Sequence, residues 1–289
     1  MQLRQTLNAA VERLTSAGVP SPRMNAELLI MFTLECDRAY LYAHPERELT
    51  PDETQRYDEA VARRATGVPA QYITGHQEFW GLDLIVSSAV LIPRPETEHV
   101  METVLQLAKA DGRDRPPPDN LRLVDVGTGS GAIALALAKQ LPSAEIHATD
   151  ISSEALEVAR ANAARHELTS RITFHRADLL NGLPHGEFDF VVSNPPYVGE
   201  SEEDSVQLEV RKFEPRNAVF AGPTGLEVIE RLIPQAQTAL RPGGWLVFEI
   251  SGTIAEAVRH RLAGWAEIQL TNDLQGIARV AAARKPSDR

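Results

Sequence analysis

Asn194, Pro195, Pro196 and Tyr197 form a short polar segment that directly follows an apolar run, Phe188–Ser193. Proline fixes its own φ and disfavours the helical region for the residue before it, so the two prolines hold Asn194 extended. We expect the Asn194 side-chain oxygen and the Pro195 carbonyl to accept hydrogen bonds from one NH2 group, with the Tyr197 ring flat against it. This arrangement suits methyl transfer onto a planar nitrogen. Taken alone, the segment also fits a strand that ends in a Pro-Pro turn.

A glycine-rich turn comes earlier in the chain, between a predicted strand, Leu121–Val126, and a helix that begins at Ala132. The turn consists of Gly127, Thr128, Gly129, Ser130 and Gly131. Glycines at such a strand-to-helix turn let a ligand approach the backbone closely. Gly127, Gly129 and Ala132 also fit the dinucleotide-binding pattern, so the turn by itself leaves a nicotinamide or flavin cofactor open.

Acidic residues follow the next two predicted strands. The strand 145–149 ends at Asp150, and the strand 171–175 is followed by Asp178 and Leu179. Asp150 suits hydrogen bonds to a ribose diol, in a methyl donor or in a dinucleotide. Asp178 is expected to accept from an adenine amino group while Leu179 covers the ring. Four successive strand ends that carry these motifs and the Asn-Pro-Pro-Tyr segment form a more specific set than any one of them.

In this order the motifs resemble those of class I S-adenosylmethionine-dependent methyltransferases, which methylate adenine N6 or a glutamine amide when Asn-Pro-Pro-Tyr stands in the fourth position. A second set of segments is similar to the peptide chain release factor N5-glutamine methyltransferases, the PrmC/HemK family: Gln71–Gly75, Phe79–Gly81, Val90–Glu98, 272–276 and Arg279. The resemblance covers nearly the whole chain. It departs at Glu249-Ile250-Ser251-Gly252 and at Ile277-Ala278, both outside the cofactor and Asn-Pro-Pro-Tyr motifs.

The resemblance implies methyl transfer from S-adenosylmethionine to the side-chain N5 of the glutamine in the Gly-Gly-Gln motif of class-1 release factors. The residues implied to bind the cofactor are Gly127, Thr128, Gly129, Ser130, Gly131, Asp150, Asp178, Leu179 and Asn194. Those implied to catalyse the reaction and bind the substrate are Asn194, Pro195, Pro196 and Tyr197, and Arg94, Glu96 and Glu98 are added for substrate binding alone. The acidic run 200–204 is expected to frame the Gly-Gly-Gln tip.

Two other functions stay open at this stage. One is methylation of adenine N6 in DNA or RNA, and the other is a catalytically idle cofactor-binding module that docks to translation factors. The net charge of −11 argues against duplex nucleic acid as the main partner, which usually needs a basic face. The first 66 residues also look too small and helical for a domain that recognises a nucleic-acid target.

Composition is typical of a globular protein: 289 residues, 43% hydrophobic and 24% charged. A single cysteine, Cys36, excludes an intramolecular disulfide, fits a reducing compartment, and is expected in the core of a helix. The eight histidines show no metal-ligand spacing, so we expect no metal. No stretch has the length of a membrane span, and we expect a cytoplasmic monomer.

The organisation of the chain changes once. Apolar residues at helical spacing predict a small bundle of four or five helices over residues 1–68. We expect this domain to dock the substrate, because one glutamine side chain offers too little surface for selective capture. Residues 69–90 are strand-like and predict a β-hairpin linker. From 91 to 289, a helix over 96–110 and a surface connection over 111–120 precede strands that alternate with helices. This pattern predicts an α/β fold with a doubly wound, mostly parallel, Rossmann-like sheet. The family resemblance implies that one antiparallel strand closes it.

Overall fold

The computed structural model describes residues 1–109 and 120–287. The chain divides into two compact units: the helical unit holds Met1–His76 and Gln207–Phe213, and the sheet unit holds Gln77–Val206 and Glu214–Arg289. The predicted surface connection over 111–120 lies, except for Asn120, outside the described residues. None of the described helices is long and apolar enough to cross a membrane.

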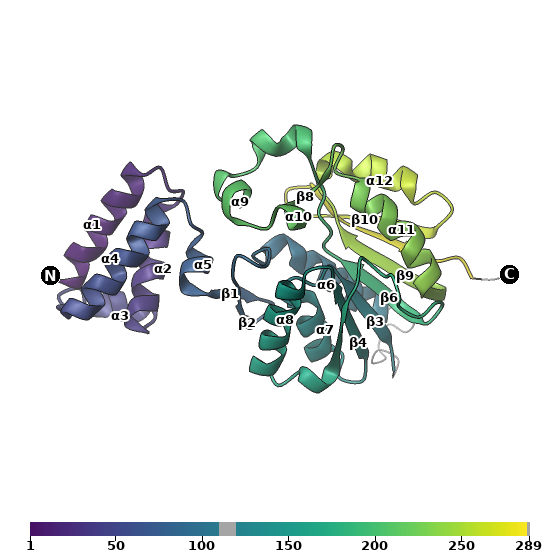
Figure 1. Ribbon diagram of the computed structural model, residues 1–289, viewed down its shortest axis with the longest axis horizontal. Helices are drawn as coiled ribbons and strands as arrows, with labels where there is room; N and C mark the ends of the chain where they lie inside the picture. The colour runs from purple at the N-terminus through teal and green to yellow at the C-terminus, as the bar shows by residue number, and fades with distance from the viewer. Residues whose placement is uncertain (110–119, 288–289) are drawn as a thin grey trace. The chain divides into compact units, whose positions relative to one another are not determined.

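The helical unit confirms the predicted bundle (Figure 1). Its helices are α1 (Leu3–Ser16), α2 (Pro22–Leu34), α3 (Arg38–Ala43), α4 (Pro51–Ala65), α5 (Ala70–Thr74) and α9 (Leu208–Phe213). Pro22 and Pro51 stand in the first turns of α2 and α4, where a missing N–H costs no hydrogen bond. Thr50 and Glu53 close a capping box on α4. Cys36 was wrongly expected inside a helix: it follows the end of α2 and is half-buried against the core.

Helix α9 is far in sequence from the rest of the helical unit, and a buried arginine joins them. The Arg64 side chain is 4% exposed; it donates to Asn25 Oδ1 at 2.7 Å, to the Val68 carbonyl at 3.1 Å, and to Glu209 Oε2 at 2.7 Å. Phe213 lies against Gly67. The segment that follows the Asn-Pro-Pro-Tyr motif therefore contributes one helix to this unit before the chain returns to the other unit at Glu214.

The sheet unit is built on seven strands in the order β10-β11-β9-β6-β3-β4-β5. Its strands are β3 (Arg122–Val126), β4 (Glu145–Asp150), β5 (Ile172–Arg176), β6 (Phe188–Ser193), β9 (Leu240–Glu249), β10 (Ala266–Asn272) and β11 (Ala278–Arg284). Strands β9, β6, β3, β4 and β5 pair in parallel, and β11 runs antiparallel to both of its neighbours. The predicted doubly wound sheet with one antiparallel strand is confirmed.

Helices cover both faces of this sheet, as Figure 1 shows. Helices α6 (Glu98–Lys109), α7 (Ala132–Gln140) and α8 (Ser153–Arg165) pack on one face, and α11 (Glu227–Ala239) and α12 (Ala255–Arg261) pack on the other. The shorter elements are η1 (Pro95–Thr97), η2 (Thr169–Arg171), η3 (Glu200–Ser205), η4 (Gly252–Ile254), α10 (Arg216–Val219), and the paired strands β7 (Val198–Gly199) and β8 (Phe220–Gly222). The central strands β3 and β6 are buried on both sides, which explains their largely apolar sequences, whereas β5 at the edge of the sheet is partly exposed.

The hairpin differs in extent from the segment predicted to form it. Residues 70–74 form helix α5, and the two strands are shorter, β1 (His76–Phe79) and β2 (Leu82–Ile85). Phe79, Leu82 and Leu84 are buried in the core beneath α6 and α7. The hairpin is thus largely part of the sheet unit, because its apolar side chains complete that core.

Arg64→Ala should lower the free energy of unfolding of the helical unit by about 2 to 4 kcal/mol, because Asn25 and Glu209 both lose a charged donor in a largely buried setting. Urea denaturation followed by circular dichroism measures the change. Arg56→Ala is the matched control, since its ion pair with Asp52 is exposed on the same helix and should contribute at most about 1 kcal/mol. Equal losses for the two variants would contradict the role given to the buried arginine.

Candidate active site

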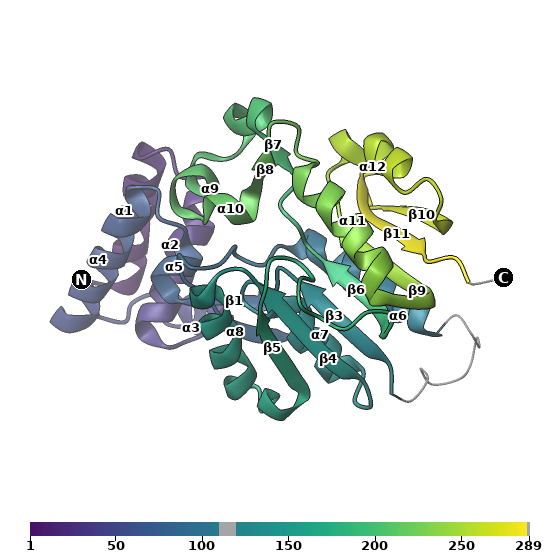
Figure 2. The same cartoon turned by 45° about the vertical axis from the view of Figure 1, so that its right-hand side comes forward.

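A cavity of about 470 Å³ lies in the sheet unit, at the carboxyl ends of the parallel strands. Figure 2 shows β6, β3, β4 and β5 as neighbours in the sheet. The predicted residues that line the cavity are Gly127, Thr128, Gly129, Ser130, Asp150, Asp178, Leu179, Asn194 and Pro196. Gly131, Pro195, Tyr197, Arg94, Glu96 and Glu98 lie outside this lining. The sheet therefore brings most of the predicted cofactor residues to one place.

Strand register explains why these motifs meet. Val126 pairs with Ser193 on one side and with Thr149 on the other, so the glycine turn, Asn194 and Asp150 begin at the same level of the sheet. The Ser193 hydroxyl donates to the Val126 carbonyl at 2.7 Å and ties the two central strands where they end. This is the point at which the strand order reverses, where open parallel sheets bind ligands.

The glycine turn needs glycine for two different reasons. Gly127, Gly129 and Gly131 all have positive φ, at 71°, 55° and 84°. A Cβ on Gly129 would meet nothing within 4 Å, whereas one on Gly131 would lie 2.5 Å from Leu135 Cδ1 and 3.3 Å from the Ala159 Cβ. Gly129 thus keeps the backbone open, and Gly131 lets α7 and α8 approach each other.

Asp125 lies beneath the glycine turn and was not predicted from the sequence. One of its carboxylate oxygens accepts from the Thr128 hydroxyl at 2.6 Å and from the Ala134 amide at 3.2 Å, which ties the turn to the first turn of α7. Complete burial raises the pKa of Asp125 to about 7. An acid at the end of an otherwise apolar strand is the sequence signal for such a residue.

Asp150 holds the far side of the glycine turn. Its two carboxylate oxygens accept from the backbone amides of Gly129 and Ser152, each at 2.9 Å. Burial raises the pKa of Asp150, and these amide hydrogen bonds oppose that rise. A carboxylate accepts about four hydrogen bonds, so Asp150 retains acceptor capacity toward the cavity that it lines.

Asp178 and Leu179 occupy the third wall of the cavity. Asp178 forms an ion pair with Arg231 of α11, which also lines the cavity and was not predicted from the sequence. Leu179 has a φ of 55°, a left-handed conformation that is uncommon for a branched residue. The Leu180 amide donates to Gln235 Oε1 at 2.9 Å and helps hold this bend. The strained backbone directs a large apolar side chain to the lining.

Asn162 of α8 fastens the hairpin to the site. Its amide oxygen accepts from the Ile85 amide at 2.6 Å, and its nitrogen donates to the carbonyls of Ile85 and Ser130, both at 2.9 Å. The side chain is completely buried. One buried amide therefore connects β2, α8 and the glycine turn.

A hydrogen-bonded chain fixes the Asn-Pro-Pro-Tyr segment. Asn194 Nδ2 donates to Thr97 Oγ1 at 2.9 Å, and the Thr97 hydroxyl donates to Glu249 Oε2 at 2.5 Å. The Tyr197 hydroxyl donates to the other oxygen of Glu249 at 2.9 Å. Thr97 and Glu249 are 4% and 2% exposed. With its nitrogen engaged, Asn194 keeps its oxygen for a ligand.

A buried acid, Glu249, dominates the electrostatics of this hydrogen-bonded chain. Burial raises the pKa of Glu249, while the two hydroxyl hydrogen bonds favour the ionised form. Burial and the neighbouring Glu249 carboxylate raise the pKa of Tyr197, so Tyr197 stays a neutral donor. Glu249 was noted from the sequence only within a departure from the family pattern, and its contact with Thr97 was not predicted. A lone acid at the end of an apolar strand is the sequence signal for such a residue.

Arg94 and Glu98, predicted to bind substrate, have partners within the unit. Arg94 forms an ion pair with Glu214, a buried residue that also accepts from the Ile92 amide at 3.1 Å. Glu98 accepts from the Trp80 amide at 2.9 Å and so joins α6 to the hairpin. Glu96 is exposed and contributes to the electrostatic environment of Glu249, Tyr197 and Arg279. The described residues offer no group of three or more potential metal ligands.

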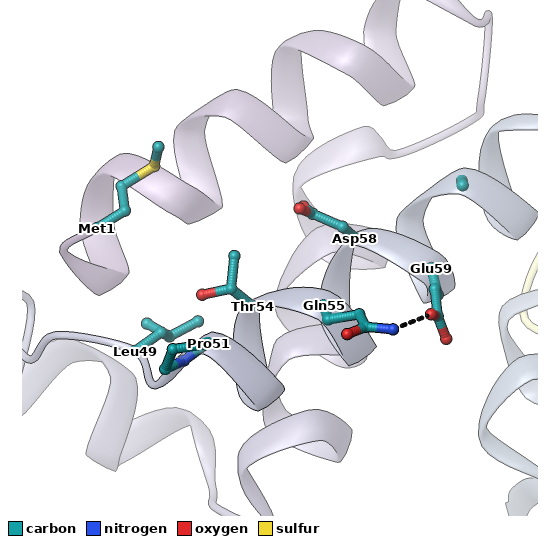
Figure 3. A pocket seen from close by; sticks show the side chains of 8 residues that line it. Met1, Leu49, Pro51, Thr54, Gln55, Asp58 and Glu59 are labelled. Atoms are coloured by element: carbon teal, nitrogen blue, oxygen red, sulfur yellow. Dashed lines mark hydrogen bonds between the residues drawn. The ribbon is translucent and has the colours of Figure 1, made fainter.

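The helical unit carries an open hollow of about 650 Å³, shown in Figure 3. It is lined by Met1, Leu49, Pro51, Thr54, Gln55, Asp58, Glu59 and Ala62. Gln55 donates to Glu59 at 3.0 Å. The hollow has no glycine turn and no strand ends, so it lacks the features that suit a nucleotide-like ligand.

Family models and known proteins match this chain over nearly its whole length. A family model described as "PrmC N-terminal domain" matches residues 5–75, and one described as "Methyltransferase small domain" matches residues 114–212. The release factor glutamine methyltransferase of Koribacter versatilis is 53% identical over 99% of this chain and 100% of its own length. The proteins of the same name from Moorella thermoacetica and Rhodopirellula baltica are 45% and 40% identical, covering 90% and 93% of this chain and 89% and 91% of theirs.

Solved structures agree on the fold alone. The hMettl16 catalytic domain, in complex with MAT2A 3′UTR hairpin 6, superposes with a TM-score of 0.58 at 18% identity, over 80% of this chain and 83% of that one. A methyltransferase from Pyrococcus furiosus superposes with a TM-score of 0.51 at 20% identity, over 71% and 90%. Both are consistent with the class I methyltransferase fold described above.

Proposed function

The chain belongs to the release factor glutamine methyltransferase family, and we propose that it transfers a methyl group from S-adenosylmethionine to the glutamine side-chain N5 in the Gly-Gly-Gln motif of class-1 release factors. The observation that carries this proposal is the Asn194 amide, whose nitrogen is held by Thr97 so that its oxygen is left to accept from a substrate NH2 group. We expect the reaction to take place in the cytoplasm, on a monomeric enzyme.

The cavity fits S-adenosylmethionine by size and by chemistry. A volume of about 470 Å³ falls within the usual range for small-molecule sites. Asp150 would accept from the ribose hydroxyls with its remaining lone pairs, and Asp178 and Leu179 would hold the adenine. The glycine turn, free of side chains at Gly129, would admit the chain that carries the sulfonium. When bound, this cofactor supplies an electrophilic methyl group.

Asp150→Ala should weaken binding of S-adenosylhomocysteine by about 1.5 to 3 kcal/mol, because charge-assisted hydrogen bonds to the ribose are lost. Titration calorimetry on the full chain measures the affinity. Glu157→Ala removes an exposed acid from α8, the helix that follows Asp150, outside the cavity lining, and should leave the affinity within about twofold. Tight binding of a nicotinamide dinucleotide, with none of S-adenosylhomocysteine, would exclude the proposed cofactor.

The protein's task is to align a poor nucleophile. An amide nitrogen is barely nucleophilic because its lone pair is delocalised into the carbonyl. Asn194 Oδ1 and the Pro195 carbonyl would accept its two hydrogens and turn the lone pair toward the methyl group, and Tyr197 would cover the amide plane. Such positioning supplies several kcal/mol of barrier reduction, up to about 7 to 11 in ideal cases. Water then suffices to take the proton from the alkylated, acidic nitrogen.

Asn194→Ala should reduce kcat for release factor methylation at least about a hundredfold while cofactor affinity changes by no more than a few fold, because the lost acceptor matters chiefly for the aligned amide. Transfer of labelled methyl groups to purified release factor measures the rate. An adenine-containing RNA oligonucleotide is the competing substrate. If the wild-type enzyme methylated the oligonucleotide in preference to the release factor, the proposed substrate would be wrong.

We further propose that the helical unit binds the body of the release factor, because one glutamine side chain offers too little surface for selective capture. The open hollow of Figure 3 supplies a surface on which apolar residues lie beside two exposed acids, Asp58 and Glu59. Glu96, Arg94, Glu98 and the acidic run 200–204 would frame the Gly-Gly-Gln tip, whose glycines let the backbone enter a narrow slot.

Asp58→Lys should raise KM for intact release factor about tenfold with little change in kcat, since it reverses a charge on the docking surface but leaves the chemistry alone. A short Gly-Gly-Gln peptide should show no change. Glu12→Lys is the control on the same unit, an exposed reversal outside the hollow. A truncation is a poorer test, because removing residues 1–76 would also strip the partners of α9. An unchanged KM for Asp58→Lys would remove this hollow from the docking surface.

A further inference from the structure

The starting point is the acceptor capacity of Glu249. Its two oxygens accept from two different hydroxyls, those of Thr97 at 2.5 Å and Tyr197 at 2.9 Å. Burial raises the pKa of Glu249, but the two hydroxyl hydrogen bonds favour its ionised form, which can only accept hydrogen bonds. In that form both hydroxyls spend their single hydrogen on Glu249, and neither donates in another direction.

The consequence passes from Thr97 to Asn194. A hydroxyl whose hydrogen is committed can only accept from its next partner, so the Asn194 group that faces Thr97 must be the NH2 and not the carbonyl. Side-chain amides are nearly symmetric in shape, and hydrogen bonding decides which way they point. The carboxylate thus dictates the orientation of an amide two hydrogen bonds away.

We propose that Glu249 and Thr97 are positioning residues that fix the Asn194 oxygen toward the substrate and thereby make the site select an amide over a carboxylate. This inference rests on the proposed function, because it assumes that Asn194 accepts from the substrate NH2. It extends that function to specificity: glutamine is bound, and glutamate in the same place is rejected.

The selection follows from matching donors with acceptors. A glutamine tip offers two hydrogens to the Asn194 oxygen and the Pro195 carbonyl, whereas a glutamate tip sets an anionic acceptor against two acceptors. If Asn194 turned over, its NH2 would face the substrate, repel the glutamine NH2 and donate to glutamate instead. Discrimination of this kind depends on the repulsive arrangement as much as on the attractive one.

The surroundings of Glu249 keep this chain of hydrogen bonds in one state. Glu249 is the last residue of β9 and is buried beside Thr97 of η1 and Tyr197. The charged groups that act on it are Glu96 and Arg279. Arg279 is itself held by Asp273 at 2.8 Å. Thr97 lines the cavity but is only 4% exposed, and its hydroxyl is engaged on both sides, by Glu249 and by Asn194.

Thr97→Val keeps the shape of the side chain and removes the hydroxyl that orients Asn194. In the full-length variant at pH 8, kcat for the glutamine-bearing release factor should fall at least about thirtyfold, because the Asn194 amide is no longer held. The decisive readout is a release factor with its tip glutamine changed to glutamate, used as a competitive inhibitor. In the Thr97→Val enzyme, the ratio of its inhibition constant to KM of the glutamine form should be about tenfold lower than in wild type, because the glutamate form is no longer rejected.

Two variants separate orientation from packing. Thr97→Ser restores the hydroxyl and should recover both kcat and the preference for glutamine. Thr103→Val makes the same change at another buried threonine, whose hydroxyl donates to the His99 carbonyl on α6, and should alter neither quantity. S-adenosylhomocysteine affinity within about threefold of wild type verifies that each variant is folded.

The outcomes are distinct. A Thr97→Val enzyme with wild-type kcat and unchanged preference would overturn the inference while leaving the proposed function intact. A wild-type enzyme that fails to methylate the release factor would overturn the proposed function itself. Should Thr97→Val fail to bind S-adenosylhomocysteine, Glu249→Gln decides the matter. Its side-chain NH2 can donate to Thr97, so loss of the glutamine preference supports the inference and retention overturns it.

Discussion

The parallel pairing of β3 with β6 is the constraint on which the site depends. Because Val126 faces Ser193 in register, the turn after one strand and the polar segment after the other start side by side. The pairing of β3 with β4 adds Asp150 at the same level. These three sequence-distant motifs are therefore brought together by the sheet itself. They follow from strand order, and a slip of one residue in register would turn every side chain to the opposite face of the sheet.

Buried polar side chains complete what the sheet begins. Asp125, Asn162 and Glu249 lie under or behind the residues that line the cavity, and each joins two or more elements by hydrogen bonds. In a medium of low dielectric such bonds are strong, and an unpaired partner is costly, so the elements are held in one arrangement. The cavity-lining residues thus depend on a layer of polar groups that the ligand would never touch.

The segment after the Asn-Pro-Pro-Tyr motif supplies one helix of the helical unit. The chain leaves the sheet unit at Val206, adds α9 to the helical unit through the ion pair of Arg64 with Glu209, and returns to the sheet unit at Glu214. Glu214 then pairs with Arg94 and the Ile92 amide near the cavity lining. The same loop is thus anchored in each unit by an ion pair that has one buried member, Arg64 in one and Glu214 in the other.

The sequence alone determined the class of fold, the order of the motifs and the family, because each of these is written in local pattern. Apolar runs mark the buried strands, proline and glycine mark the turns, and the acids after successive strands lie at one edge of any parallel sheet. The membership of α9 in the helical unit, the helix at 70–74, and the partners of Arg94 and Glu98 were decided only in the tertiary structure. So was the link from Asn194 through Thr97 to Glu249, which joins residues 97 and 152 positions apart in the chain. Hydrogen bonds between such distant side chains leave no periodicity in the sequence, and their direction is set by which buried group can only accept.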